Sequence, residues 1–123
     1  MDAEVISSLI DKNSFSELDI FLDIAVTNVC DAHIEYHNSG ENLKEIILAS
    51  CSISPLIKPV LLGDTLLADG GIIDNFPVQR LMSLPYKILG INLYSNDSKT
   101  PVSIVGWIKK VFFIAWHSHN LNK

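Results

Sequence analysis

An aspartate followed by two glycines, Asp69-Gly70-Gly71, lies where an apolar segment of the sequence ends. The apolar residues before it predict a buried strand, so the carboxylate lies at a strand end, where the glycines let the backbone turn without a Cβ clash. A carboxylate held in this way can act on a reacting group as a general base. Asp-Gly pairs also occur in ordinary turns, where the aspartate only caps the turn, so this tripeptide alone leaves both interpretations open.

A second polar group alternates with apolar residues. His33, Glu35 and His37 fall on one face of a predicted strand, and such side chains bind zinc in other proteins, here with His117 and His119 as further candidate ligands. A solvent-exposed strand face explains the same alternation, and the last two histidines suit a frayed chain end. We therefore expect no metal, and no feature of the sequence implies an organic cofactor.

The segments around these residues alternate between helical and strand patterns. This alternation, together with strands rich in Ile, Leu and Val, predicts an α/β fold: a layered α/β/α domain with a mainly parallel central sheet. A Ser14-to-Glu17 capping box and an Asn42 helix cap support two of the helical starts. Predicted helices cover residues 2–12, 43–50, 77–84 and 103–118, and predicted strands cover 21–29, 31–37, 60–62, 65–68 and 86–93, with a hairpin turn at Gly63-Asp64.

Composition limits the class of protein. The chain has 123 residues, 48% of them apolar, which suits one domain over residues 1–123. The formal net charge is −5 and Arg80 is the only arginine, so we expect no nucleic-acid partner. The longest uncharged apolar stretch, Ile46–Ile57, is shorter than the ~20 apolar residues of a membrane-spanning helix. No secretory signal is visible, so we expect a cytoplasmic location with Cys30 and Cys51 as buried free thiols.

Several short segments resemble, in family order, the patatin-like phospholipases, which are serine acyl hydrolases. The most specific of them is Asp-Gly-Gly-x-x-x-Asn-x-Pro with an Ala-Ser pair upstream, and the resemblance extends over about residues 14–93. The matching segments are Ser14-Phe15-Ser16-Glu17-Leu18, Ile24-Ala25-Val26-Thr27-Asn28-Val29, Ala49-Ser50 with Pro59-Val60, Asp69-Gly70-Gly71, Asn75-Phe76-Pro77-Val78 and Ile88-Leu89-Gly90-Ile91.

The resemblance implies that Asp69 is the acidic partner of a Ser/Asp catalytic dyad that cleaves acyl esters of lipids without a histidine. Asp69 would accept the proton of the serine hydroxyl and then help to deliver water to the acyl enzyme. The other positions that the family pattern marks are Gly70 and Gly71 in the turn, Asn75 and Pro77 at the start of the next helix, and Ala49 and Ser50 as candidate lining of the acyl pocket.

The serine of such hydrolases lies in a Gly-x-Ser-x-Gly elbow near a glycine-rich oxyanion loop. Neither occurs in the 123 residues. In the family both precede the part matched here, so the sequence is interpreted as the C-terminal portion of a patatin-like domain and predicted to be inactive alone. Ser50 and Ser52 are alternative nucleophiles, but neither is flanked by glycines, and serines that end a helix explain both.

Other functions stay open at this stage. The helix predicted at 103–118 carries Phe113 and Trp116 beside Lys109, which suits peripheral contact with a membrane, although packing or a partner interface explains these residues as well. A non-catalytic module that binds lipid or protein is the alternative to a hydrolase, and a remnant without function is a third interpretation. A sheet lacking its neighbours exposes an edge, so we expect self-association or binding of a missing N-terminal half.

Overall fold

A computed structural model describes most of the first ninety residues and parts of the C-terminal segment. The chain divides into two compact units, residues 1–74 and residues 75–123, and each is described by itself. The described residues are 5, 8–54, 56–91, 103–108, 110, 111 and 114.

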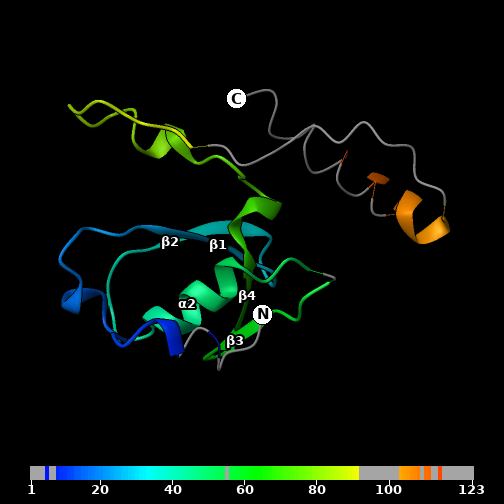
Figure 1. Ribbon diagram of the computed structural model, residues 1–123, viewed down its shortest axis with the longest axis horizontal. Helices are drawn as coiled ribbons and strands as arrows, with labels where there is room; N and C mark the ends of the chain where they lie inside the picture. Colours follow the sequence, from blue (N-terminus) through cyan, green and yellow to red (C-terminus); the bar gives the residue numbers. More distant parts are fainter. Residues whose placement is uncertain are drawn as a thin grey trace. The chain divides into compact units, whose positions relative to one another are not determined.

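The first unit is built on a four-stranded sheet in the order β2-β1-β4-β3 (Figure 1). The strands are β1 at Ile24–Asn28, β2 at His33–His37, β3 at Val60–Leu62 and β4 at Thr65–Asp69. All three pairings are antiparallel. The prediction of a mainly parallel sheet is therefore wrong for the described strands, while the mixed α/β class is confirmed.

Connection length explains two of the three antiparallel pairings, β1 with β2 and β3 with β4. Parallel neighbours need a crossover of a dozen or more residues, whereas short loops return the chain in the opposite direction. A two-residue turn at Gly63-Asp64, with Gly63 at φ +60, joins β3 to β4 as predicted. A short loop also joins β1 to β2, and Ala32 in it has φ +54, so β2 begins at His33 and not at Asp31.

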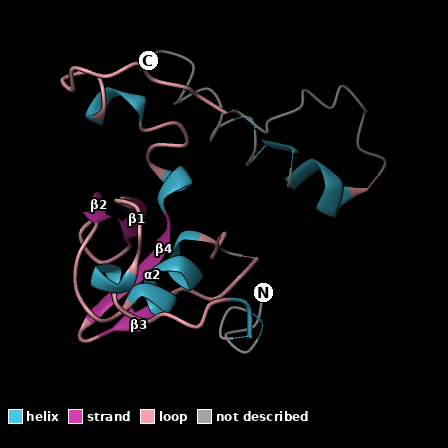
Figure 2. Cartoon of the chain, turned by 60° about the vertical axis from the view of Figure 1, so that its left-hand side comes forward, coloured by secondary structure: helices cyan, strands magenta, loops and turns pink. Residues whose placement is uncertain are grey.

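One helix, α2 at Leu43–Ser50, packs on β1, β3 and β4 (Figure 2). Its Leu43, Ile46 and Ala49 are buried against Val26 and Leu67, which form the centre of the hydrophobic core. The i, i+3, i+6 spacing puts these helix residues on one face, so the helix and the sheet bury their apolar faces against each other.

The starts of the helices differ from the sequence prediction in one case. Ser14 and Glu17 form the predicted capping box at η1, a 3-10 helix at Phe15–Glu17. Asn42 makes no side-chain cap. Instead Asn13 accepts from the first N–H groups of α2, through its carbonyl at 2.9 Å from Leu43 N and its side-chain oxygen at 3.5 Å from Lys44 N. A distant residue thus satisfies the helix start.

In the described part of the second unit, regular structure is less extensive than the sequence predicts. The helix predicted from Pro77 to residue 84 is a single 3-10 turn, η3, at Val78–Arg80. The strand predicted at 86–93 is wrong for residues 86–91, which pair with no other strand, and its last two residues lie outside the described part. Residues 104–108, 110, 111 and 114 are helical, as predicted.

At the N-terminus, residues 5, 8 and 9 are helical, and most of the helix predicted at 2–12 lies outside the described residues. Within the described part of the chain, no helix combines the length and hydropathy needed to cross a membrane.

Candidate functional site

Asp69 is the last residue of β4, as the sequence predicts. It lies opposite Val26 of β1, and Val26 lies opposite Glu35 of β2. Residues directly opposite each other on paired strands point to the same face of a sheet. Because Val26 is fully buried in the core with α2, the side chains of Asp69 and Glu35 belong to the α2 face as well.

The carboxylate of Asp69 has one protein partner. The Gly71 N–H donates to Oδ1 at 2.8 Å, so that Asp69 caps the 3-10 helix η2 at Gly70–Ile72. No other hydrogen bond or ion pair to this carboxylate occurs among the described residues. Oδ2 is therefore available to another group.

Burial changes the acidity of this carboxyl group. Asp69 is half-buried, and its pKa is raised above the ordinary value because desolvation penalises the charged form, although the Gly71 hydrogen bond acts in the opposite direction. A higher pKa makes the ionised group a stronger base. The site thus combines an anchored oxygen, an available oxygen and increased basicity.

Gly70 is required by crowding and not by its backbone angle. A Cβ atom at this position would lie 2.5 Å from the carbonyl oxygen of Ala25 and 2.9 Å from the Ala25 Cβ. Gly71, also buried, supplies the N–H that holds Asp69. The pair therefore shapes the turn as expected, but Gly70 does so by letting two backbones approach closely.

Asn75 and Pro77 belong to the second unit. Pro77 is the N-cap of η3, and Asn75 is exposed. Pro77 therefore begins a short helical turn, and the role of Asn75 stays a prediction.

The upstream Ala-Ser pair is part of the end of α2. Ala49 is fully buried in the core, and Ser50 Oγ donates to the Ile47 carbonyl at 2.9 Å. Ser52 is buried, and its Oγ donates to the Leu48 carbonyl at 2.7 Å. These hydroxyls support the interpretation of Ser50 and Ser52 as serines that end a helix. The pocket-lining role of Ala49 and Ser50 stays a prediction.

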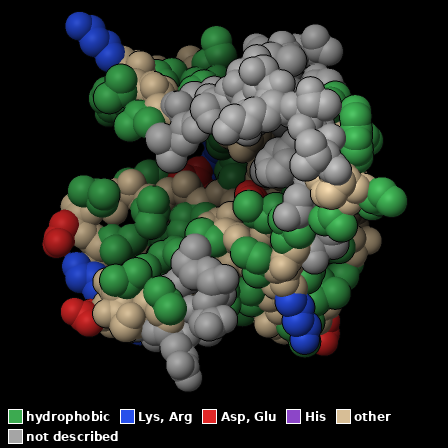
Figure 3. Space-filling model, turned by 45° about the vertical axis from the view of Figure 1, so that its right-hand side comes forward, with side chains coloured by type: hydrophobic (Ala, Val, Ile, Leu, Met, Phe, Trp, Pro, Cys, Tyr) green, Lys and Arg blue, Asp and Glu red, His purple; other side chains and the backbone are tan. Residues whose placement is uncertain are grey.

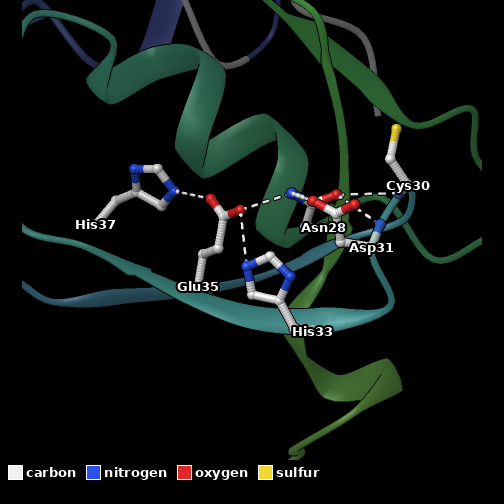
Figure 4. Close-up of polar contacts among 6 residues, drawn as sticks. All are labelled: Asn28, Cys30, Asp31, His33, Glu35 and His37. Atoms are coloured by element: carbon white, nitrogen blue, oxygen red, sulfur yellow. Dashed lines mark hydrogen bonds and ion pairs between the residues drawn. The ribbon is translucent and has the colours of Figure 1, made fainter.

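The second polar group forms a connected network (Figure 4). Glu35 accepts from Asn28 Nδ2 at 2.7 Å through Oε1, and its two oxygens lie 3.2 Å from His33 Nε2 and 3.1 Å from His37 Nε2. The pKa of Glu35 is lowered, first by the hydrogen bond from Asn28, against desolvation and with further help from the two histidines. This carboxylate is held by three side chains.

Asn28 is the residue that the sequence interpretation missed in this network. It is 4% exposed, and its Oδ1 also accepts from the N–H groups of Cys30 and Asp31 in the loop after β1. The available signal is an asparagine just before the gap between the strands predicted at 21–29 and 31–37, because Asn side chains often accept from backbone N–H groups two residues further on. Pairing with His33 then places it beside Glu35.

The zinc alternative gains no support from the structure. Among the residues described, no three His, Cys, Asp or Glu side chains are arranged to hold a metal ion. His117 and His119 lie outside the described residues. Cys30 and Cys51 are free thiols, as predicted, but the prediction that both are buried is wrong, because Cys30 is exposed and Cys51 is only partly buried.

Apolar side chains are widely exposed on the first unit. The largest exposed fractions in it include 79% at Phe21, 75% at Ile20 and 65% at Leu61 on the edge strand β3. Figure 3 shows apolar side chains over much of the face that it presents, with few charged groups between them. Exposure of this extent is typical of a surface that other polypeptide or lipid covers.

Comparison with known proteins identifies relatives of this chain. A model of the family described as Patatin-like phospholipase matches residues 3–82. Lysophospholipase NTE1 of Debaryomyces hansenii is 33% identical over 78 residues, which is 63% of this chain and 5% of the relative. Lysophospholipase nte1 of Neurospora crassa is 33% identical over 94 residues, 74% of this chain and 6% of the relative. The NTE1 lysophospholipase of Kluyveromyces lactis is 35% identical over 78 residues, 63% of this chain and 5% of the relative.

The chain thus spans a small fraction of the length of the curated relatives that it matches. The family match covers more than half of the chain and includes both Asp69 and the turn after it. This chain belongs to the patatin-like phospholipase family.

Proposed function

We propose that this chain supplies the acidic member of a Ser/Asp dyad in a lipid acyl hydrolase and that Asp69 is its general base. One observation carries the proposal. The Asp69 carboxylate is half-buried at a strand end with a raised pKa, and its single partner within the described part of the chain, Gly71 N–H, occupies only Oδ1. A carboxylate kept for structural reasons alone is normally paired more fully.

In this mechanism, Oδ2 of Asp69 accepts the proton of a serine hydroxyl while the serine oxygen attacks the ester carbonyl. The carbon–oxygen bond to the alcohol then breaks, and the proton passes from Asp69 to the departing alkoxide. Water next attacks the acyl enzyme while Asp69 accepts a proton from that water. The bond between the acyl carbon and the serine oxygen then breaks, Asp69 returns the proton to the serine oxygen, and the fatty acid is released. The Gly71 hydrogen bond holds Oδ1 in place throughout, so that Oδ2 stays oriented toward the serine hydroxyl.

The nucleophile and the oxyanion donors come, in this proposal, from polypeptide other than these 123 residues. The sequence contains no Gly-x-Ser-x-Gly. Ser52, whose backbone contacts Asp69, has its hydroxyl engaged by the Leu48 carbonyl. Exposed apolar side chains, among them Phe21 and Ile20 before β1 and Leu61 on β3, are positions that further polypeptide can cover. The relatives are named as lysophospholipases, so we propose single-chain phospholipids as the substrate class.

A chimera tests this proposal. Residues 3–82 replace the matching segment of the Debaryomyces hansenii lysophospholipase, and release of fatty acid from a lysophospholipid is measured. We expect activity, and a loss of about 100-fold or more in kcat on Asp69→Asn. Glu35→Gln, on the same sheet face, is the matched control and should retain most of the activity.

Two results would contradict the proposal: a folded chimera without activity, or an Asp69→Asn chimera as active as its parent. The 123-residue chain alone should not hydrolyse a short-chain nitrophenyl ester. If the isolated chain hydrolyses this ester and loses the activity on Asp69→Asn, the proposal that the nucleophile comes from other polypeptide is wrong.

A non-catalytic module is the second candidate, favoured by the exposed apolar residues and by β3 as a sheet edge. Light scattering separates the two. A monomer at all concentrations would favour an independent binding domain, and concentration-dependent association would favour a chain that is normally covered by further polypeptide.

A further inference from the structure

The backbone of Asp69 is not held by the strand ladder on its β1 side. Val29 N–H donates to the Leu66 carbonyl at 2.8 Å. In an antiparallel pair, hydrogen-bonded and non-hydrogen-bonded positions alternate. Thr27 opposite Ala68 is therefore a hydrogen-bonded position, whereas Asp69 opposite Val26 is not. The N–H and C=O groups of Asp69 consequently need partners other than the backbone of β1.

Both groups find such partners. The Asp69 N–H donates to the Ser52 carbonyl at 3.1 Å, and the Asp69 carbonyl accepts from the Thr27 hydroxyl at 2.8 Å. Thr27 neighbours Val26 along β1, so its side chain lies on the opposite face of the sheet from the carboxylate. The peptide that carries the carboxylate is thus fixed from one side by a loop and from the other by a side chain.

The hydroxyl of Thr27 is not needed by the strand itself. Val has the same shape and suits a buried strand at least as well, and the three residues of β1 before Thr27 are apolar. Thr27 is 4% exposed, and burying a hydroxyl costs free energy unless it is hydrogen-bonded. Among the described residues, the backbone carbonyl of Asp69 is the only hydrogen-bond partner of the Thr27 hydroxyl. The Thr27 hydroxyl therefore stabilises the end of β4 and makes no hydrogen bond within β1.

We propose that Thr27 is a positioning residue for Asp69, whose hydroxyl fixes the Asp69 carbonyl and thereby the turn that aims the carboxylate. This inference rests on the proposed function for its catalytic meaning, but its structural content concerns this chain alone. The Asp69 carbonyl and the Gly71 N–H flank the residue that must bend, Gly70. If the carbonyl loses its donor, the turn loosens, the Gly71 N–H leaves Oδ1, and the carboxylate reaches water.

The test is made by NMR spectroscopy on the complete 123-residue chain. Thr27→Val removes the donor and keeps the shape, and Thr27→Ser keeps the donor. Thr65→Val is the matched control, because Thr65 is a half-buried threonine of β4 whose hydroxyl makes no hydrogen bond among the described residues. The readouts are hydrogen exchange of the Gly71 amide and the titration of the Asp69 side-chain carboxyl carbon.

In Thr27→Val, the Gly71 amide should exchange about tenfold faster or more. The pKa of Asp69 should fall toward its ordinary value, since desolvation is the main cause of its rise. Thr27→Ser and Thr65→Val should leave both readouts close to wild type. A folded Thr27→Val chain with unchanged Gly71 exchange and unchanged Asp69 titration would overturn the proposal, as would equal effects of Thr65→Val.

A measurement on the wild-type chain covers the case in which Thr27→Val does not fold. The Thr27 hydroxyl proton should exchange with water slowly enough to give its own NMR signal, because it is buried and bonded to Asp69 O. Absence of this signal at low temperature would overturn the proposal. These readouts need no catalysis, so they can fail while Asp69→Asn still abolishes hydrolysis in the chimera, and the reverse also holds.

Discussion

Two carboxylates lie in one row across the sheet, on either side of Val26, and their surroundings differ. Glu35 is held by Asn28, His33 and His37, and its pKa is lowered. Among the residues that the structure describes, only the Gly71 N–H holds the Asp69 carboxylate, and burial raises the pKa of this group. The same face of the same sheet therefore contains one carboxylate that is stabilised as an anion and one that is not.

Under the proposed function, this difference separates a structural carboxylate, Glu35, from a reactive one, Asp69. Hydrogen bonds to the charged form favour ionisation, whereas desolvation opposes it. A group that the fold leaves poorly paired is a candidate for a task that the fold itself does not need. We infer that Glu35 stabilises the β1–β2 hairpin and that Asp69 is kept available at some cost in stability.

The largest effect is expected from Gly70→Ala, which disrupts the turn that holds the Asp69 carboxylate. The new Cβ would meet the Ala25 backbone carbonyl, which cannot move without displacing β1. We expect the free energy of unfolding to fall by about 3 kcal/mol in urea titrations. Gly63→Ala is the control, because its position has positive φ but open space, and it should cost only about 1 kcal/mol. Equal costs would show that crowding is not the reason for Gly70.

Asn28→Ala disrupts the hydrogen-bond network around Glu35. It removes the main donor to Glu35 and the acceptor for the N–H groups of Cys30 and Asp31. The expected loss is about 2 kcal/mol of unfolding free energy, and the pKa of Glu35 should rise toward its ordinary value. Asn38→Ala, which removes a single long contact of 3.5 Å to Asp23, is the control. A loss no greater than that of the control would contradict a structural role for the network.

The two carboxylates should give opposite pH dependences of stability. Because the folded-state pKa of Glu35 is lowered, its contribution is present above the pKa of the unfolded chain and is lost as pH falls through the folded value. Because the pKa of Asp69 is raised, stability falls as pH rises from the unfolded to the folded value, and the cost remains at neutral pH.

Two variants separate these contributions in unfolding experiments between pH 3 and pH 7. Glu35→Gln should lower stability at pH 7, and Asp69→Asn should leave it unchanged or raise it, each by about 1 kcal/mol or less. A loss of stability at pH 7 on Asp69→Asn would mean that Asp69 is a structural residue.

Ala32→Gly gives the smallest effect and sharpens the comparison at the hairpin. Ala32 has φ +54, which disfavours residues with a Cβ. Glycine should relieve this strain and raise the free energy of unfolding, measured by urea titration, by about 0.5 kcal/mol. No gain would mean that the flanking Asn28 contacts already offset the strain.

Local features of the fold could be predicted from the sequence. The Ser14 capping box, the Gly63-Asp64 turn and the position of Asp69 at a strand end depend on a few adjacent residues, and all three are present. The family resemblance was likewise carried by short segments, and the family match confirms it.

Features that depend on distant residues could not be predicted in this way. A segment rich in apolar residues, such as the strand predicted at 21–29, looks the same in a parallel and an antiparallel sheet, so the predicted parallel direction of pairing is wrong. Asn13 rather than Asn42 caps α2 because the chain returns to that point. The crowding at Gly70 and the donors around Glu35 also require the register of β1 with its neighbours.

The most direct test of the central claim is a carbon-13 NMR titration of the Asp69 and Glu35 carboxyl groups in one sample of the complete chain. The account predicts a pKa above the ordinary value for Asp69 and below it for Glu35, because burial dominates at the first site and hydrogen bonds dominate at the second. An Asp69 that titrates below its ordinary value would contradict the account, since it would be a fully paired anion like Glu35.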